Sequence, residues 1–350
     1  MKIYWPYFFL ILIVALTTSS KPGNDKKKKL SVLKVTGNVF TDENNEVKIL
    51  RGVSFSDPDK LEKEGNWNLK YFQEAKKWGC NVVRFPVHTY TWRYRGSKEY
   101  LGLLDKGVQW ATQTGMYVII DWHAIGNLPE NKFPGFNYAT SWDEIVKFWQ
   151  IIAEKYKGNP TVAFYELFNE PTDQGAPLTW KVWKPMMENL IDKINAIDDK
   201  KICLVAGMDW AYLLDEVIEN PVKQSNVAYV THPYPQKREQ PWEPQWEADW
   251  GKVAKHYPII ATEFGFVVKG ARGEHVPVVG DETYGKAIID YFDEMGISYT
   301  VWCFDPHWSP ALLDNYKFKP SARQGEFFKA ILQRNLPSST IDKKQVSFFK

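Results

Sequence analysis

The sequence predicts an α/β fold of the (β/α)8 TIM-barrel type, preceded by a short N-terminal β-hairpin. Eight short apolar segments alternate with segments of helical periodicity, which is typical of a parallel sheet, and eight strands close a barrel. Polar side chains follow nearly every apolar segment, as they do where barrels carry a binding site at the C-terminal strand ends. An open doubly wound sheet is the alternative, but no glycine-rich phosphate loop follows any expected strand.

The N-terminal segment has the pattern of a secretory signal peptide, with Lys2, an apolar run over 3–16 and small residues over 17–20. This run is shorter than the ~18 residues expected of a membrane span. An uncleaved anchor is the alternative. The chain is accordingly divided into a signal peptide (1–20), a basic polar tether (21–30), a barrel domain (31–336) and a polar tail (337–350).

The hairpin is expected from the apolar segments 33–35, 37–40 and 47–50, with a polar turn over 42–45. The last of these segments leads into the first barrel strand. The eight barrel strands are expected at 50–55, 81–87, 117–123, 161–164, 201–207, 227–234, 258–265 and 298–304.

Helices are expected between these strands because apolar residues recur there at helical spacing. Their expected ranges are 68–78, 98–113, 142–156, 180–197, 212–218, 246–255, 283–295 and 323–334. Gly79, Gly115 and Gly296 follow three of them as stop signals. Ser141 followed by Glu144 has the pattern of a capping box at the start of another.

Composition excludes some functional classes. The net charge is +2, with 44 basic and 42 acidic residues, whereas a nucleic-acid-binding protein usually has a strong basic excess. The 16 Trp, 18 Tyr and 20 Phe suit stacking on sugar rings, although core packing accounts for many of them. Cys80, Cys203 and Cys303 form no CxxC pair and are expected to be buried free thiols. We expect a monomer without a cofactor or metal.

Two glutamates occupy equivalent positions at the ends of buried strands. Glu170 follows the apolar run 161–164, and Glu263 lies in the segment 258–265. A pair of carboxylates at one barrel mouth is what glycoside hydrolysis requires, and a separation of about 5 Å gives retention of configuration.

The neighbours of each glutamate suggest different roles. Arg84 is a fixed cation and Tyr234 a hydroxyl donor, and either one beside Glu263 would favour its ionised form. Glu170 is flanked by apolar residues and is the better candidate for the protonated acid.

Other polar and aromatic residues at the strand ends are candidates for substrate contact. Asn169 is expected to donate its amide to a sugar 2-hydroxyl, and His123 and His232 to orient the site by hydrogen bonds, with a structural histidine as the alternative for each. Trp302 is a candidate floor under the sugar, and Asp121 is either a supporting or a purely structural residue. Further tryptophans expected near the cleft are Trp92, Trp122, Trp210, Trp242, Trp246 and Trp308.

Six segments resemble glycoside hydrolase family five, the cellulase-like retaining (β/α)8 glycosidases, in family order. They are Val83-Arg84-Phe85-Pro86, Asp121-Trp122-His123, Phe168-Asn169-Glu170-Pro171, His232-Pro233-Tyr234, Thr262-Glu263-Phe264-Gly265 and Val301-Trp302. The resemblance implies Glu170 as acid/base and Glu263 as nucleophile. It also implies substrate binding by Arg84, His123, Asn169, His232, Tyr234 and Trp302.

The resemblance leads us to expect a secreted, extracellular or periplasmic endo-β-1,4-glucanase that acts on β-glucan. A mannanase, xyloglucanase or mixed-linkage glucanase would use the same catalytic set, and the loops 92–94, 126–136 and 242–250 carry no signature that separates them. A metal-dependent barrel hydrolase is a remote alternative, although no His-x-His or His-Glu-x-x-His occurs. An inactive sugar-binding barrel is a further alternative. The presence of both glutamates argues against it.

Overall fold

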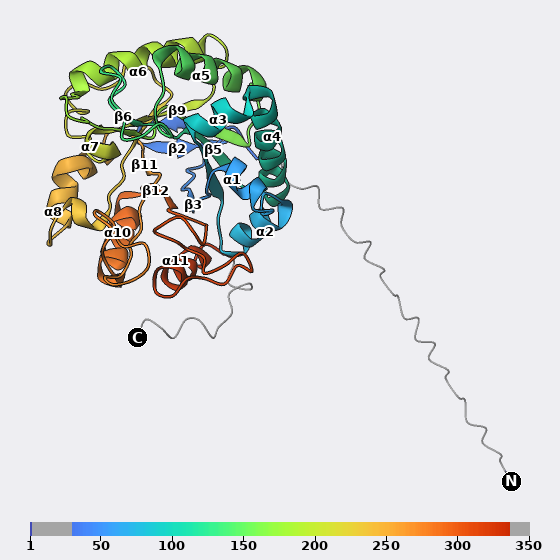
Figure 1. Cartoon of the computed structure of the whole chain (residues 1–350). Coiled ribbons are helices and arrows are strands. Elements are labelled where there is room, and N and C mark those ends of the chain that lie inside the picture. Colours follow the sequence, from blue (N-terminus) through green and yellow to red (C-terminus); the bar gives the residue numbers. More distant parts are fainter. Residues whose placement is uncertain (2–29, 337–350) are drawn as a thin grey trace.

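The computed structural model describes Met1 and residues 30–336 (Figure 1). Residues 2–29 of the expected signal peptide and tether, and the expected tail 337–350, lie outside the described residues. Among the helices of the described part, none is long and apolar enough to cross a membrane.

Eight parallel strands form the closed barrel that the sequence predicted (Figure 1). They are β3 (Arg51–Ser54), β4 (Val82–Val87), β5 (Tyr117–Trp122), β7 (Val162–Glu166), β9 (Ile202–Ala206), β10 (Val227–Val230), β11 (Ile259–Ala261) and β12 (Ser298–Val301). The barrel closes where β12 pairs with β3, with Tyr299 opposite Arg51. Every residue of these strands is buried, because helices cover the outside and side chains fill the inside.

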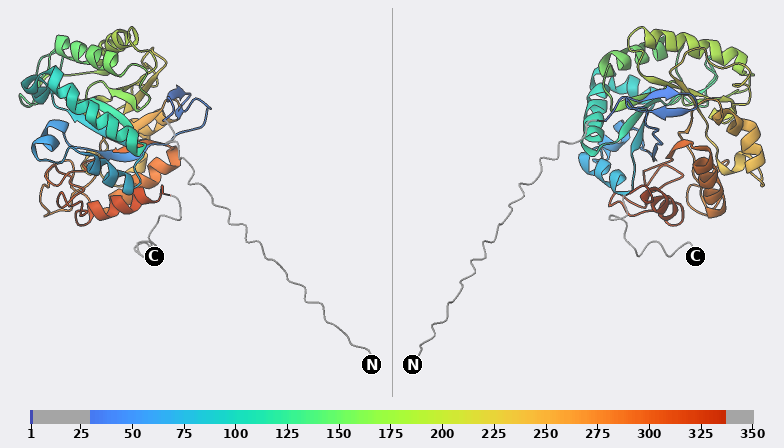
Figure 2. Two further views of the ribbon diagram at one scale, coloured as in Figure 1. Left: turned by 90° about the vertical axis from the view of Figure 1, so that its right-hand side faces the viewer. Right: turned by 180° about the vertical axis from the view of Figure 1, so that it is seen from behind.

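The long helices around the barrel begin and end within three residues of the predicted positions (Figures 1 and 2). They are α2 (Leu69–Lys77), α4 (Ser97–Thr114), α5 (Trp142–Tyr156), α6 (Trp180–Asn195), α10 (Glu282–Met295) and α11 (Gln324–Gln333). The Ser141 hydroxyl accepts a hydrogen bond from the Glu144 backbone N–H, as a helix N-cap does. Gly115 and Gly296 end α4 and α10 in the left-handed conformation.

The N-terminal hairpin consists of β1 (Lys34–Thr36) and β2 (Val39–Thr41). The right-hand view of Figure 2, from behind, shows the hairpin in front of the barrel. It therefore covers the barrel end that faces away from the viewer in Figure 1. Phe40 enters the barrel core there, with its ring centroid 5.1 Å from that of Phe164. The expected third strand over 47–50 is reduced to one bridge, between Thr41 and Val47.

One predicted helix is wrong. Residues 212–218 form turns, and the helical residues precede them as α7 (Met208–Ala211). Asp209, Trp210 and Ala211 all have positive φ angles, of 51°, 61° and 57°. The reason is competing hydrogen bonding: Met208 and Leu213 pair through their backbones, so their amides do not continue a helix.

The helix expected at 246–255 begins three residues earlier and contains one π-helical turn. Its parts are α8 (Glu243–Trp246), η2 (Glu247–Gly251) and α9 (Lys252–Ala254). Elements that the sequence did not predict are α1 (Pro58–Lys63), α3 (Thr89–Arg95), β6 (Ile125–Gly126), β8 (Glu170–Pro171) and η1 (Pro235–Lys237). The three cysteines are free and buried, as predicted.

The close approach of β3 to β4 gives a test of the barrel packing. A Cβ atom on Gly52 would lie 1.9 Å from the Val82 carbonyl oxygen. We therefore expect Gly52→Ala to lower the free energy of unfolding by about 1–3 kcal/mol, because the backbone of β3 or β4 must move to make room for the methyl group. Urea unfolding measures this change.

Gly102→Ala is the matched control, because Gly102 is exposed within α4 and a Cβ atom there meets nothing within 4 Å. This control should stabilise the protein by about 0.5–1 kcal/mol, since alanine is the better helix former. Equal stability of the two variants would contradict the packing seen between β3 and β4.

Candidate active site

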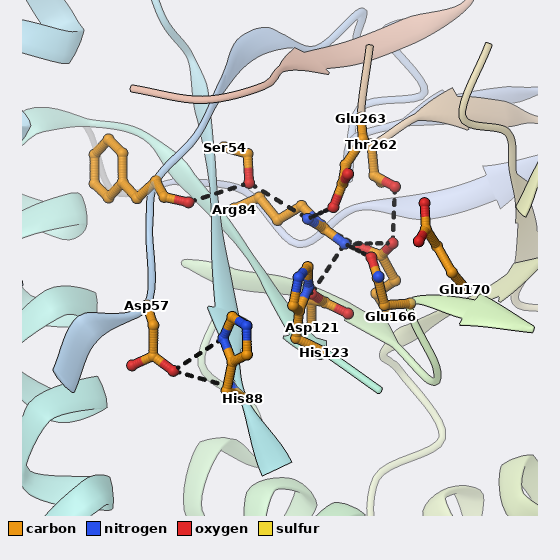
Figure 3. A network of polar contacts seen from close by, with 12 residues as sticks. Ser54, Asp57, Arg84, His88, Asp121, His123, Glu166, Glu170, Thr262 and Glu263 are labelled. Carbon is orange, nitrogen blue, oxygen red and sulfur yellow. Dashed lines mark hydrogen bonds and ion pairs between the residues drawn. The ribbon is translucent and has the colours of Figure 1, made fainter. Parts of the chain in front are cut away.

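Glu170 and Glu263 lie close together at the C-terminal mouth of the barrel (Figure 3). Glu170 begins β8, which pairs with β6 above the barrel strands, and Glu263 follows β11 by two residues. One carboxylate oxygen of each lies within 4.8 Å of the other. This close approach fits the 5–5.5 Å separation of the carboxyl groups in retaining glycosidases better than the 6.5–9.5 Å of inverting ones.

Both carboxylates open into a cavity of about 610 Å³. Aromatic and polar side chains from the loops after several strands line this cavity. They include His123, Tyr138, Asn169, Trp210, Tyr234, Lys237, Val276 and Trp302. A cavity of this size with apolar rings and a few polar groups suits an organic ligand of several rings.

Arg84 is the fully buried centre of the polar network behind the cavity (Figure 3). Its Nη1 donates to Glu263 Oε1 at 2.7 Å, and its Nε and Nη2 donate to the two oxygens of Glu166 at 2.6 and 3.0 Å. Nη2 also donates to Asn169 Oδ1 at 2.7 Å and lies 2.9 Å from Asp121 Oδ2. Burial opposes the charge, but these three carboxylates raise the pKa of Arg84 further above its usual value.

His232 connects the acid/base candidate to the same network. Its Nδ1 lies 3.0 Å from Glu170 Oε1, and its Nε2 lies 2.9 Å from Thr262 Oγ1. Thr262 gives its single hydroxyl proton to Glu166 Oε1 at 2.7 Å, so Nε2 of His232 must act as the donor to Thr262. Burial lowers the pKa of His232, but the carboxylates of Glu263, Glu166 and Glu170 outweigh it and raise the pKa to about 9.

Arg84 lies beside Glu263 and His232 beside Glu170, as the reasoning from the residues expected, but neither makes the substrate contact that the family resemblance implied. Both side chains are completely buried, and neither lines the cavity. Substrate contact was expected of them, but the structure places them behind the glutamates, where they hold the carboxylates in position. Arg84 lies within β4 and His232 two residues after β10, and carboxylates surround both side chains.

Asn169 presents its amide nitrogen to the cavity. Its Oδ1 accepts from Arg84, which fixes the orientation of the amide, since Arg84 has no lone pair to accept with. Its Nδ2 is buried without a hydrogen-bond partner, and the residue lines the cavity. A buried unpaired donor at a cavity wall is the arrangement expected of a group that binds a ligand hydroxyl.

Glu263 is held by two donors, as the sequence suggested. Arg84 donates to its Oε1, and the Tyr234 hydroxyl donates to its Oε2 at 3.1 Å. Burial nevertheless raises the pKa of the Glu263 carboxyl above its usual value, with Arg84 and His232 opposing and Glu170 adding to the rise. The neighbouring Glu170 carboxylate disfavours a second negative charge on Glu263, and this adds to the rise in the pKa of Glu263.

His123 and Trp302 form a parallel pair at the wall. The two rings lie 5.7 Å apart with an interplanar angle of 2°. His123 Nδ1 is 2.7 Å from Asp121 Oδ2. Burial, together with the charges of His88, Arg84 and His232, lowers the pKa of His123 well below its usual value, so the ring is neutral. Asp121 contacts both His123 and Arg84, and the choice between a supporting and a purely structural role for it stays a prediction.

The tryptophans divide into two groups. Trp210 lines the cavity, and Trp308 stacks behind Trp302 at 5.7 Å. Trp92 and Trp122 were expected in the cleft, but they are buried against Phe148 beneath α5 and do not line the cavity. Trp242 and Trp246, which were among the six from which several were expected near the cleft, stack on each other at 5.9 Å outside the cavity.

Sequence reasoning missed Glu166 and Thr262, which complete the buried network. Glu166 is the last residue of β7, and its side chain is fully buried. The signal in the sequence was an acid within an otherwise apolar strand, since a buried acid requires a partner. It also missed Tyr138 and Lys237, which line the cavity from loops.

Glu170, His232 and Glu263 have side chains of the kinds that bind metals, and one atom of each lies within 4.8 Å of the others. Both ring nitrogens of His232 lie at hydrogen-bond distance from other side chains, Nδ1 3.0 Å from Glu170 Oε1 and Nε2 2.9 Å from Thr262 Oγ1. A metal ligand must instead offer a free nitrogen lone pair. His232 would therefore have to give up one of these contacts to bind a metal.

A carboxylate pair at the mouth of a (β/α)8 barrel is the arrangement of a glycoside hydrolase site. Comparison with protein families agrees, because residues 41–307 match the model of the family described as "Cellulase (glycosyl hydrolase family 5)". The chain belongs to this family.

Relatives and solved structures support this membership. The chain is 29% identical over 272 residues to an endoglucanase of Clostridium saccharobutylicum and 27% identical over 297 residues to endoglucanase A of Butyrivibrio fibrisolvens. These alignments cover 77% and 80% of the chain, but only 56% and 62% of the relatives. The β-glucanase SdGluc5_26A of Saccharophagus degradans, solved in complex with cellotetraose, is 41% identical with a TM-score of 0.85, covering 88% of this chain and 94% of that one.

The raised pKa of His232 predicts how stability depends on pH. The folded pKa of about 9 exceeds the ordinary 6.5, so the stabilisation is complete below about pH 6.5 and is lost as the pH rises through 9. We expect the wild type to lose up to about 3 kcal/mol relative to His232→Gln across this range. Urea unfolding of both proteins from pH 6 to 9.5 measures the difference.

Thr262→Val provides a second variant for the same measurement, because it keeps the shape of the side chain and removes the link between His232 and Glu166. The pH-dependent loss should be smaller in this variant. A constant difference between wild type and His232→Gln at all these pH values would contradict a protonated His232.

Proposed function

We propose that this chain is a secreted, retaining endo-β-1,4-glucanase that hydrolyses β-glucan by double displacement. The observation that carries the proposal is the carboxylate pair of Glu170 and Glu263, within 4.8 Å of one another at the mouth of the barrel. The membership in family 5 and the likeness to a β-glucanase solved with cellotetraose support it.

In the first step, Glu263 acts as the nucleophile and attacks the anomeric carbon. The glycosidic bond breaks as its oxygen takes the proton of Glu170, and a covalent glycosyl-enzyme forms. The Asn169 amide donates to the sugar 2-hydroxyl, a hydrogen bond that strengthens in the transition state. The imidazolium of His232, 3.0 Å from Glu170, stabilises the negative charge that Glu170 acquires.

In the second step, Glu170 acts as a base and takes a proton from a water molecule. This water attacks the anomeric carbon, and the bond to Glu263 breaks. Arg84 and Tyr234, each hydrogen-bonded to one oxygen of Glu263, stabilise the carboxylate that leaves. Two inversions at the same carbon give net retention.

The cavity wall suits a glucan. Trp302 and Trp210 line it, and indole faces stack on the apolar faces of sugar rings. A mannanase, a xyloglucanase and a mixed-linkage glucanase would use the same two glutamates. Which of these polysaccharides the protein cleaves must therefore be measured directly.

We further infer that residues 1–20 are removed on export, leaving the tether 21–30, the barrel domain 31–336 and the tail 337–350. The charge, apolar run and small residues of the first twenty positions support this. N-terminal sequencing of exported protein tests it.

A polysaccharide screen tests the substrate. We expect cleavage of soluble cellulose, with a rapid fall in viscosity relative to reducing ends, because an endo-acting enzyme cuts within chains. Mannan should be cleaved at least tenfold more slowly, and xyloglucan and lichenan complete the comparison. Turnover should persist in EDTA, since catalysis rests on carboxylates. Loss of activity in EDTA would favour a metal-dependent hydrolase instead.

Azide rescue separates the two glutamates. Glu170→Ala should lose 10²–10⁴-fold on polysaccharide, yet still form the glycosyl-enzyme from an aryl glycoside whose leaving group needs no proton. Azide should then restore turnover and give a β-glycosyl azide. Glu263→Ala cannot form the intermediate, so azide should attack the substrate directly and give the α-azide.

NMR of the two azide products measures their anomeric configuration, and the wild type hydrolysis product serves as the control. Exchanged configurations would mean that the two roles are reversed. An inverted product from the wild type would refute double displacement.

A further inference from the structure

Three aromatic side chains form an exposed cluster outside the cavity. In the part of the chain that the structure describes, the exposed large aromatic residues are Tyr90, Tyr94 and Phe136, at 39%, 72% and 67% exposure. The rings of Tyr90 and Tyr94 stack at 5.8 Å, and Phe136 lies edge-on to Tyr90 at 5.1 Å. Every other described tryptophan, tyrosine and phenylalanine is buried or half-buried, so this clustering requires an explanation.

The cluster lies beside the barrel mouth on a rigid support. Tyr90 and Tyr94 belong to α3, which starts two residues after β4 ends at the mouth (Figure 1). Being four residues apart, they lie on one face of the helix. The start of α3 is fixed by buried Asp57, which accepts from the His88 backbone N–H at 3.0 Å and the Thr91 hydroxyl at 2.7 Å (Figure 3).

The loop that carries Phe136 connects the cluster to the cavity. Arg93 of α3 donates to the Phe136 carbonyl at 3.2 Å, and Thr89 donates to the Asn137 carbonyl at 2.9 Å. Tyr138, two residues beyond Phe136, lines the cavity, with its ring 6.2 Å from that of His123. Successive residues of one anchored segment therefore present rings to the outer surface and to the cavity wall.

The chemistry of the cluster matches a sugar chain. Exposed apolar rings on an anchored surface mark a binding site more often than a packing defect. Neither the Tyr90 nor the Tyr94 hydroxyl has a hydrogen-bond partner among the described residues, so both are available to sugar hydroxyls. Three rings in contact present apolar faces and edges on which pyranose rings stack.

We propose that Tyr90, Tyr94 and Phe136 form an outer binding site for β-glucan, which holds the part of a long chain that extends beyond the catalytic cavity. This inference rests on the proposed function and deepens it, because it predicts a preference for long chains over short ones. The continuity through Tyr138 favours a glucan chain over a second copy of this protein.

The test compares Tyr90→Ala/Tyr94→Ala and Phe136→Ala with the matched control Tyr90→Phe/Tyr94→Phe, which keeps both rings. The alanine variants should raise KM for soluble cellulose roughly two- to tenfold per ring removed. Their kcat/KM for an aryl cellobioside should stay unchanged, because this substrate is too short to leave the cavity. The phenylalanine control should lose less than the alanine variant.

Retardation in native gels that contain soluble cellulose measures binding without catalysis. The alanine variants should migrate faster than the wild type there and equally in gels without polysaccharide. Unchanged KM and unchanged retardation would overturn the outer site while leaving the proposed function intact. If the wild type proved inactive, the proposed function would be refuted. The gel would still measure whether the outer cluster binds glucan, because retardation does not depend on catalysis.

Analytical sedimentation tests whether a second copy of this protein binds the cluster instead of glucan. If the alanine variants change the mass of the protein in solution and leave glucan retardation unchanged, the cluster is a contact between copies and the proposal is wrong. Thermal unfolding should give the same midpoint for all variants, because the substituted side chains are exposed.

Discussion

The site depends on the burial of one guanidinium group. Arg84 is removed from water, so its charge must be balanced by groups that stay close to it. Glu166 binds it with both oxygens, and Glu263 and Asn169 take further N–H groups. These partners come from β7 and from the segments after β7 and β11. The requirement to pair one buried cation therefore fixes the positions of Glu263 and of Asn169, the residue before Glu170.

His232 extends this constraint to Glu170. The chain of contacts from Glu170 through His232 and Thr262 to Glu166 is continuous, and Glu166 ends on Arg84. Two cations and a set of carboxylates thus share one buried volume. In the proposed mechanism, a change in the charge of Glu170 is met by fixed hydrogen-bond donors rather than by the reorganisation of water. The site is preorganised by its own packing.

The cavity and its surroundings differ in how they are built. Trp302 lies parallel to His123 and packs against Trp308, each at 5.7 Å between ring centroids, and these contacts fix its position. Trp210 is the middle one of three successive residues that have a left-handed backbone conformation. This conformation costs roughly 1–2 kcal/mol per residue. Such strain is retained where function depends on it. The outer cluster of Tyr90, Tyr94 and Phe136 is held instead by the hydrogen bonds that join α3 to Asp57 and to the loop of Phe136.

The sequence by itself determined the barrel and the meeting of Glu170, Glu263, Asn169 and Tyr234. Strand and helix periods are local, and parallel strands bring all their C-terminal ends to one face, so no tertiary information was needed. Only the tertiary structure decided which tryptophans face the cavity and which, like Trp122, pack in the core. An indole ring suits both environments equally, and its direction is set by neighbours distant in sequence. The tertiary structure also decided how the buried charges pair. The sequence shows that Glu166 is an acid in a buried strand, but not that Arg84 is the cation that lies against it.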